Sequence, residues 1–163
     1  MIRLSLTLMA LATPALAQEY PVDRDAVLAC FDATAGNLNP PGCIGAAAEM
    51  CMERSEGGYT TVGMASCVSS ETAIWDELLN TVYGDLRADM GALDADDTNA
   101  GRSRVEALRD AQRAWIAFRD ADCAFNWAIF QEGTMRSLVS TGCMLDMTAD
   151  RVLELHSHLE APY

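Results

Sequence analysis

Residues 111–123 read Ala-Gln-Arg-Ala-Trp-Ile-Ala-Phe-Arg-Asp-Ala-Asp-Cys, and this stretch decides the fold of the chain. At 3.6 residues per turn, one side of a helix collects five side chains of this region: Leu108, Gln112, Trp115, Arg119 and Cys123. Polar Gln112 and Arg119 therefore lie on the face that is expected to be buried. Because buried polar groups need hydrogen-bond partners, this face predicts a specific neighbouring helix rather than a generic apolar contact.

A second long helix is predicted upstream of this stretch. Its apolar side chains recur at helical spacing: Trp75, Leu78, Leu79, Val82, Leu86 and Met90. Ser69 or Ser70 is the expected N-cap, and Glu71 falls in the first turn, where the helix dipole favours an acid. The helix is expected to end near Gly91, and an acidic loop follows over residues 93–101.

Two helices are expected from this loop onward. The central one runs from about Arg102 to Phe130, and a turn around Gly133 leads to a last helix that starts near Met135. Spacings of three and four residues favour one helix to about residue 158. The alternative breaks this helix and uses Thr148 as a fresh N-cap. Long helices joined by short loops are expected to pack antiparallel.

The first part of the chain differs in character. Residues 1–17 are typical of a signal peptide, with one arginine, a short apolar run and an Ala-Leu-Ala cleavage site. The apolar run is too short to span a bilayer, so we expect an exported protein without a membrane anchor, periplasmic or secreted. Residues 18–66 hold two short helix candidates, 22–33 and 43–54, separated by Gly- and Pro-rich loops. The predicted fold is all-α: a bundle of about three long helices, residues 67–163, with a disulfide-tied N-terminal helical cap.

Cysteine content and charge narrow the classes of function. Six cysteines in an exported chain predict three disulfides, for which 15 connectivities exist. The net charge is −13 and the chain contains no lysine. This balance excludes nucleic acid as a natural partner and disfavours an anionic membrane surface, because no basic patch is available to neutralise phosphates. It favours a basic protein partner.

Catalytic and metal-binding patterns are weak. His156 and His158 lie two residues apart on a predicted helix and so point to different faces. Oxidised cysteines leave no thiolate for catalysis or zinc binding. Asp94 and Asp96 begin the spacing of a calcium loop, but the glycine and the distal glutamate of such a loop are missing. We therefore predict no enzyme activity, no metal and no cofactor.

Several sequence elements resemble the lysozyme inhibitor LprI family over about residues 67–160. The family pattern joins Leu-Asn-x-x-Tyr, then Ala-Gln-Arg-Ala-Trp-x-x-aromatic-Arg-Asp-x-x-Cys, a Gly-containing loop, a second Cys and Thr-x-x-Arg. The matching residues are Leu79, Asn80, Tyr83, Gln112, Arg113, Trp115, Arg119, Asp120, Cys123, Gly133, Cys143, Thr148 and Arg151. The resemblance implies a disulfide between Cys123 and Cys143. For the remaining cysteines we predict the pairs Cys30–Cys43 and Cys51–Cys67.

These motif residues are expected to act mainly in the structure. Arg119 would pair with Asp76, or hydrogen-bond Asn80 and Tyr83 on the facing helix, so that Gln112 and Arg119 set the register of the two helices. The alternative interpretation makes Arg119 and Arg113 part of a binding face.

The resemblance implies a protein that inhibits a cationic lysozyme by binding it. An alternative is a periplasmic adaptor or envelope-stress protein with another partner, because function depends on sites rather than on folds. Exposed loops between rigid helices are the candidate contact sites. Their candidate residues are Asp94, Asp96, Asp97, Glu132 and Arg136.

Overall fold

The structure is a computed structural model that describes residues 19–34, 42–97 and 101–162. Five α-helices make up this part of the chain, and no strand occurs within it. The helices are α1 Arg24–Thr34, α2 Ala46–Arg54, α3 Thr61–Asp96, α4 Arg104–Ile129 and α5 Met135–Leu159. The predicted all-α class is confirmed. The predicted signal peptide, residues 1–17, lies outside the described residues.

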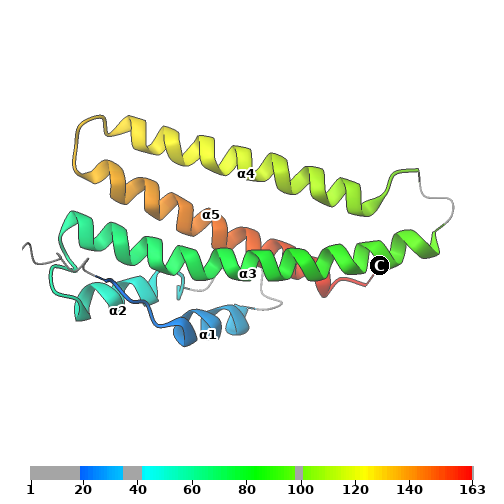
Figure 1. The fold of residues 1–163 in the computed structure, drawn as a ribbon, viewed down its shortest axis with the longest axis horizontal. Coiled ribbons are helices and arrows are strands. Elements are labelled where there is room, and N and C mark those ends of the chain that lie inside the picture. The colour runs from blue at the N-terminus through cyan, green and yellow to red at the C-terminus, as the bar shows by residue number, and fades with distance from the viewer. Residues whose placement is uncertain (1–18, 35–41, 98–100, 163) are drawn as a thin grey trace, which may run out of the picture.

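The first half of helix α5 lies between α3 and α4, and its second half passes behind α3 in the view of Figure 1. Helix α4 runs antiparallel to α3, and α5 reverses direction again, so that α3 and α5 are parallel to each other. Helices α1 and α2 pack against α3 on the side away from α4. One core joins these elements, with Val27 of α1, Ala48 of α2, Trp75 of α3 and Val152 of α5 all buried. The outermost long helix is α4.

Helix α3 is longer than its sequence predicts. It begins at Thr61 rather than after Ser69 or Ser70, because Thr60 is the N-cap and its Oγ1 accepts a hydrogen bond from the backbone N–H of Gly63 at 3.0 Å. Only glycine fits at position 63, since a Cβ there would lie 2.2 Å from the carbonyl oxygen of Gly57. At its other end α3 continues to Asp96 instead of ending near Gly91. The same helix therefore runs through residues 66 and 67, where the cap was predicted to end.

Glu71 is the central polar group of the core. Its side chain is 1% exposed and accepts hydrogen bonds from the backbone N–H groups of Gly45 at 2.8 Å and Ala48 at 2.7 Å, at the start of α2. The indole N–H of Trp75 donates to it at 3.2 Å. Glu71 lies in the third turn of α3, not in the first turn where the sequence analysis placed it. It thus acts as the N-terminal cap of a different helix, α2.

The disulfides and the last helix agree with the sequence analysis. Cys30–Cys43, Cys51–Cys67 and Cys123–Cys143 are bonded, and the described part of the chain has no free cysteine. Helix α5 is continuous from residue 135 to residue 159. Thr148 is fully buried in its middle and is not an N-cap. The unbroken alternation of three- and four-residue spacing was therefore the correct signal.

Candidate functional site

The motif residues on α4 connect all three long helices. Trp115 is covered by two guanidinium groups, those of Arg119 at 5.0 Å and Arg151 at 5.7 Å from the ring centroid. Arg119 also forms ion pairs with Asp120 at 2.9 Å and with Asp76 of α3 at 3.8 Å, which confirms the predicted Asp76 contact. Arg119 therefore links α4 to α3 through Asp76.

Gln112 has a different hydrogen-bond partner from the one that the sequence predicted. Its Oε1 accepts a hydrogen bond from the Nε of Arg151 at 3.0 Å, so it fixes α4 against α5 rather than against α3. Both residues are 8% exposed, and Arg151 also pairs with Glu154 at 2.8 Å. Asn80 likewise does not reach Arg119: its amide donates to the backbone carbonyl of Asp76, four residues earlier in α3, at 2.8 Å.

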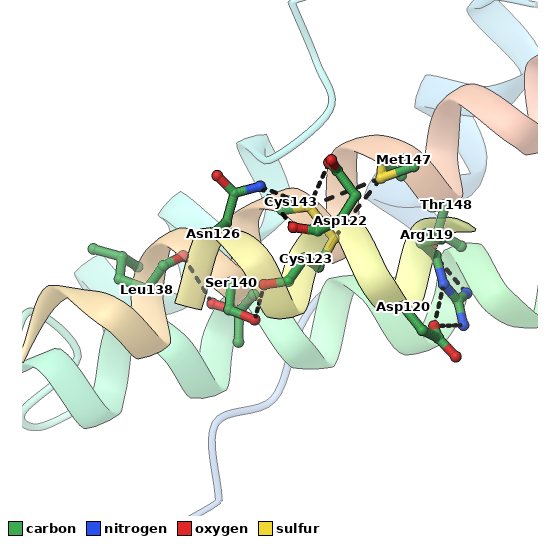
Figure 2. Close-up of a disulfide and its surroundings, with 11 residues drawn as sticks. Arg119, Asp120, Asp122, Cys123, Asn126, Leu138, Ser140, Cys143, Met147 and Thr148 are labelled. Carbon is green, nitrogen blue, oxygen red and sulfur yellow. Dashed lines mark hydrogen bonds and ion pairs between the residues drawn. A yellow bond between two sulfur atoms is a disulfide. The ribbon is translucent and has the colours of Figure 1, made fainter. Parts of the chain in front are cut away.

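Farther along α4, a disulfide binds it to α5 (Figure 2). Cys123 and Cys143 lie with their Cα atoms 5.5 Å apart, and the hydroxyl of Ser140 donates to the carbonyl oxygen of Cys123 at 3.2 Å. About one turn earlier, Nη1 of Arg119 lies 3.5 Å from the hydroxyl of Thr148. Because Gln112 and Cys123 are the two buried residues of α4, the disulfide is a principal anchor of this helix.

A groove of about 360 Å³ opens between α3 and α4. We call it the α3–α4 groove. Its lining residues are Asn80, Tyr83, Arg87, Arg109, Gln112, Arg113 and Ile116. Among these, Asn80, Tyr83, Gln112 and Arg113 belong to the sequence motifs quoted above, which come from two separate parts of the chain. The fold therefore brings these motifs to one surface depression.

The charge of the α3–α4 groove is opposite to that of the chain. Arg87, Arg109 and Arg113 are exposed and bring positive charge to a protein with a net charge of −13. Arg109 pairs with its neighbour Asp110 at 3.3 Å. Arg87 and Arg113 form no hydrogen bond or ion pair within the described residues. Guanidinium groups bind carboxylates through paired N–H donors, so this groove is chemically suited to acidic groups of a ligand.

The loop residues predicted to contact a partner lie at opposite ends of α4. Asp94 and Asp96 are in the last turn of α3, next to the start of α4, whereas Glu132 and Arg136 lie beyond its end. A helix of 26 residues is about 39 Å long, so the two sets do not form one compact site. Arg136 stacks on Trp127 at 4.9 Å and donates to the carbonyl oxygen of Gln131 at 2.9 Å. Gly133 lies in the connecting turn, where its N–H donates to the carbonyl oxygen of Phe130 at 2.8 Å.

The side chain of Asp94 is hydrogen-bonded to the residues at the start of α4. Its carboxylate accepts hydrogen bonds from the hydroxyl of Ser103 at 2.7 Å and from the backbone N–H groups of Arg104 at 2.9 Å and Val105 at 3.1 Å. The Ser103 hydroxyl, followed by the Arg104 backbone N–H, holds the pKa of Asp94 well below its usual range. Asp97 pairs with Arg104 at 2.9 Å. The hydrogen bonds of Asp94 therefore join the end of α3 to the start of α4.

These hydrogen bonds of Asp94 predict that Asp94→Asn lowers the Tm by an amount that depends on pH. Because the folded-state pKa is lowered, the carboxylate contributes stability above the unfolded-state pKa of about 3.9, and this contribution is lost as the pH falls toward the folded-state value. We expect the variant to have a lower Tm at neutral pH. The difference from the parent protein should narrow below about pH 4. Thermal unfolding followed by circular dichroism across this range measures it, and a constant difference at all pH values would contradict the assignment.

Sequence reasoning missed three members of the α3–α4 groove, Arg87, Arg109 and Ile116. Tyr83 and Arg87, like Arg109 and Arg113, are four residues apart and so share a helix face. That spacing was a usable signal, but it does not reveal that the two faces meet. Within the described residues, no group of three or more His, Cys, Asp or Glu side chains is placed to hold a metal ion. Over the same residues, no helix has the length and apolar character needed to cross a membrane.

Comparison with known proteins identifies the family. The model of the family described as lysozyme inhibitor LprI matches residues 51–155. An uncharacterized protein of Rhizobium meliloti (strain 1021), R02472, is 33% identical over 98 residues, which cover 58% of this chain and 70% of that protein. No solved structure matches. The family match extends over α3, α4 and most of α5 and includes all the residues that carry the motifs. This chain belongs to the LprI lysozyme inhibitor family.

Proposed function

We propose that this protein is an exported inhibitor that binds a cationic lysozyme, with the α3–α4 groove as a contact surface. Family membership supports lysozyme binding in general. Three disulfides are typical of a protein outside the cytoplasm, and residues 1–17 are the proposed signal peptide. The observation that carries the proposed contact is the convergence of family-motif residues from α3 and α4 on one arginine-lined groove.

The charges of the two partners suggest how they would meet. A net charge of −13 would steer a cationic lysozyme toward the protein at long range. At contact, Arg87 and Arg113 would engage acidic side chains of the lysozyme. Glycoside hydrolases use a pair of carboxyl groups at the scissile bond, so acidic groups are to be expected at the cleft that an inhibitor has to cover.

The loop residues predicted to contact a partner do not all lie near the α3–α4 groove. Asp96 is exposed on the half of the bundle that holds the α3–α4 groove, so it can flank the same contact. Glu132 is exposed at the far end of α4. We therefore propose Asp96 as a secondary contact, and we expect Glu132 and Arg136 to contribute less.

The test is a lysis assay with the oxidised mature protein, a cationic lysozyme and a suspension of peptidoglycan. The parent protein should protect the suspension in a saturable manner that survives physiological salt, since simple charge pairing is screened there. Arg113→Ala and Arg87→Ala should each weaken inhibition about 10-fold, the size of a lost charge-assisted hydrogen bond. Arg54→Ala is the matched control, because Arg54 is an exposed arginine on α2, away from the groove.

The direction of the change in inhibition distinguishes a direct contact at the groove from attraction by net charge. Each Arg→Ala change makes the protein more acidic, so attraction by net charge alone would be unchanged or stronger. Loss of inhibition specific to the groove variants would therefore identify a direct contact. Full activity of Arg113→Ala would exclude the groove, and no protection by the parent protein in micromolar excess would refute the inhibitor function.

A further inference from the structure

Helix α4 exposes an apolar face that no part of the described chain covers. Phe118 is 61% exposed, Phe125 63% and Ile129 53%, all on the side of α4 away from the bundle. Ala114, Ala121 and Ala128 lie beside them and are exposed as well. We call these six residues the outer seam. A solvent-facing helix surface is normally polar, and contiguous exposed apolar patches mark interaction sites.

The outer seam has the spacing of a coiled-coil interface. Phe118 and Phe125 are seven residues apart and occupy one heptad position, called a. Ala114, Ala121 and Ala128 repeat every seven residues at the second core position, d. Small residues at one core position let two helix backbones approach closely, while the rings at the other position fill the space between them. Such a surface fits another helix.

We propose that the outer seam binds a second copy of this chain, through antiparallel packing of α4 on α4. In antiparallel coiled coils, position a of one helix faces position d of the other. With the two-fold axis between residues 119 and 120, Phe118 faces the partner's Ala121, and Phe125 faces the partner's Ala114. Each ring thus meets a small residue, which is the self-complementarity that a two-fold interface requires. Parallel packing would instead stack ring on ring and leave gaps between alanines.

The charges near the outer seam favour a second copy of this chain, rather than a cationic protein, as its partner. The six seam residues are uncharged, so the seam offers no carboxylate to a basic partner. The chain is nevertheless strongly acidic, and self-association requires that like charges do not meet. In the antiparallel register, Asp122 lies beside the partner's Trp115, and Asp110 lies level with the partner's Ile129 at the end of α4. No acidic side chain next to the seam faces another one.

The expected dimer interface is small. The seam covers about 24 Å of helix and buries four phenylalanine rings per dimer, which places it at the lower end of specific interfaces. We therefore expect a dissociation constant in the micromolar range. Arg109 and Arg113 project from other faces of α4, so both α3–α4 grooves stay open in the dimer. This inference is independent of lysozyme binding.

Sedimentation equilibrium of the oxidised protein tests the inference. The parent protein should show monomer–dimer exchange, and Ala121→Glu should weaken the dimer at least 10-fold by placing a charge against the partner's Phe118. Ala88→Glu is the control, because Ala88 is an exposed alanine of α3 outside the outer seam. Ala121 is exposed as well, so neither change should alter the Tm greatly.

A mixing experiment separates an interface defect from a folding defect. Ala121→Glu and Ala121→Arg should each be monomeric, whereas an equimolar mixture should form a heterodimer, because the two positions lie close together at the two-fold axis. A parent protein that stays monomeric up to about 100 µM would overturn the proposal. So would a dimer that Ala121→Glu leaves unchanged. Lysis inhibition by the monomeric variant should equal that of the parent protein, so the outcomes for the groove and for the seam are independent.

Discussion

Glu71→Ala is expected to lower the free energy of unfolding by about 3–5 kcal/mol, and the Tm by about 10 °C. The change leaves three buried donors without an acceptor: the backbone N–H groups of Gly45 and Ala48 and the indole N–H of Trp75. It also opens a cavity in the core beside Trp75, which is fully buried. Urea unfolding followed by far-UV circular dichroism measures the loss.

Two further variants make this prediction specific. Glu71→Gln keeps the volume and one acceptor oxygen but turns an amide toward at least one donor, so we expect an intermediate loss of about 1–3 kcal/mol. Glu77→Ala is the control on the same helix, because the side chain of Glu77 forms an exposed ion pair with Arg24. Such pairs contribute about 0–1 kcal/mol. Equal losses for Glu71→Ala and Glu77→Ala would contradict the capping role of Glu71.

Replacing both Cys123 and Cys143 by alanine is expected to cost about 3 kcal/mol, because the bridge joins residues 20 apart in the sequence. The larger effect should be local. Helix α4 has only two buried residues, Gln112 and Cys123, so its contact with α5 depends strongly on this bond. Hydrogen–deuterium exchange should show α4 losing protection first, while α3 and α5 remain protected.

The Cys30–Cys43 disulfide provides the matched comparison. It joins residues 13 apart and ties α1 to the segment before α2. Its removal should cost a similar free energy by loop entropy but should leave exchange in α4 unchanged. Uniform loss of protection in both double variants would mean that α4 does not open separately from the rest of the bundle.

Local patterns in the sequence predicted the elements well. The spacing of apolar residues predicted α5 as one helix through Thr148, and the density of motif residues predicted α4. The cysteine pairs were also correct, two of them joining near neighbours in sequence. The predicted start of α3 was wrong because Thr60, like the serines at 69 and 70, is a suitable N-cap residue, and Thr60 is the one that caps the helix. A cap residue signals a helix start, but it does not say which of several candidates is used.

The roles of polar residues required the tertiary structure. Glu71 carries the same local signal as any acid near a helix start, yet two of its three hydrogen-bond donors are 26 and 23 residues away in the chain. Asp94 was predicted to be an exposed loop residue, but its carboxylate accepts hydrogen bonds from the start of the next helix. Gln112 was correctly expected to need a partner, and the partner proved to be Arg151, 39 residues later. Hydrogen bonding requires a donor and an acceptor to meet, and which ones meet depends on how the helices pack.

The sequence by itself determined the helical class, because periodicity is a local property, and its motifs carried the resemblance that predicted the family and the Cys123–Cys143 disulfide. The tertiary structure alone decided where the motifs act. Arg87 and Arg113 lie 26 residues apart and form one groove only because α4 folds back along α3. The outer seam is likewise a heptad pattern in the sequence, but only the packing of α4 at the edge of the bundle leaves it exposed. Exposure depends on which faces the other helices cover, and that is a property of the assembled fold.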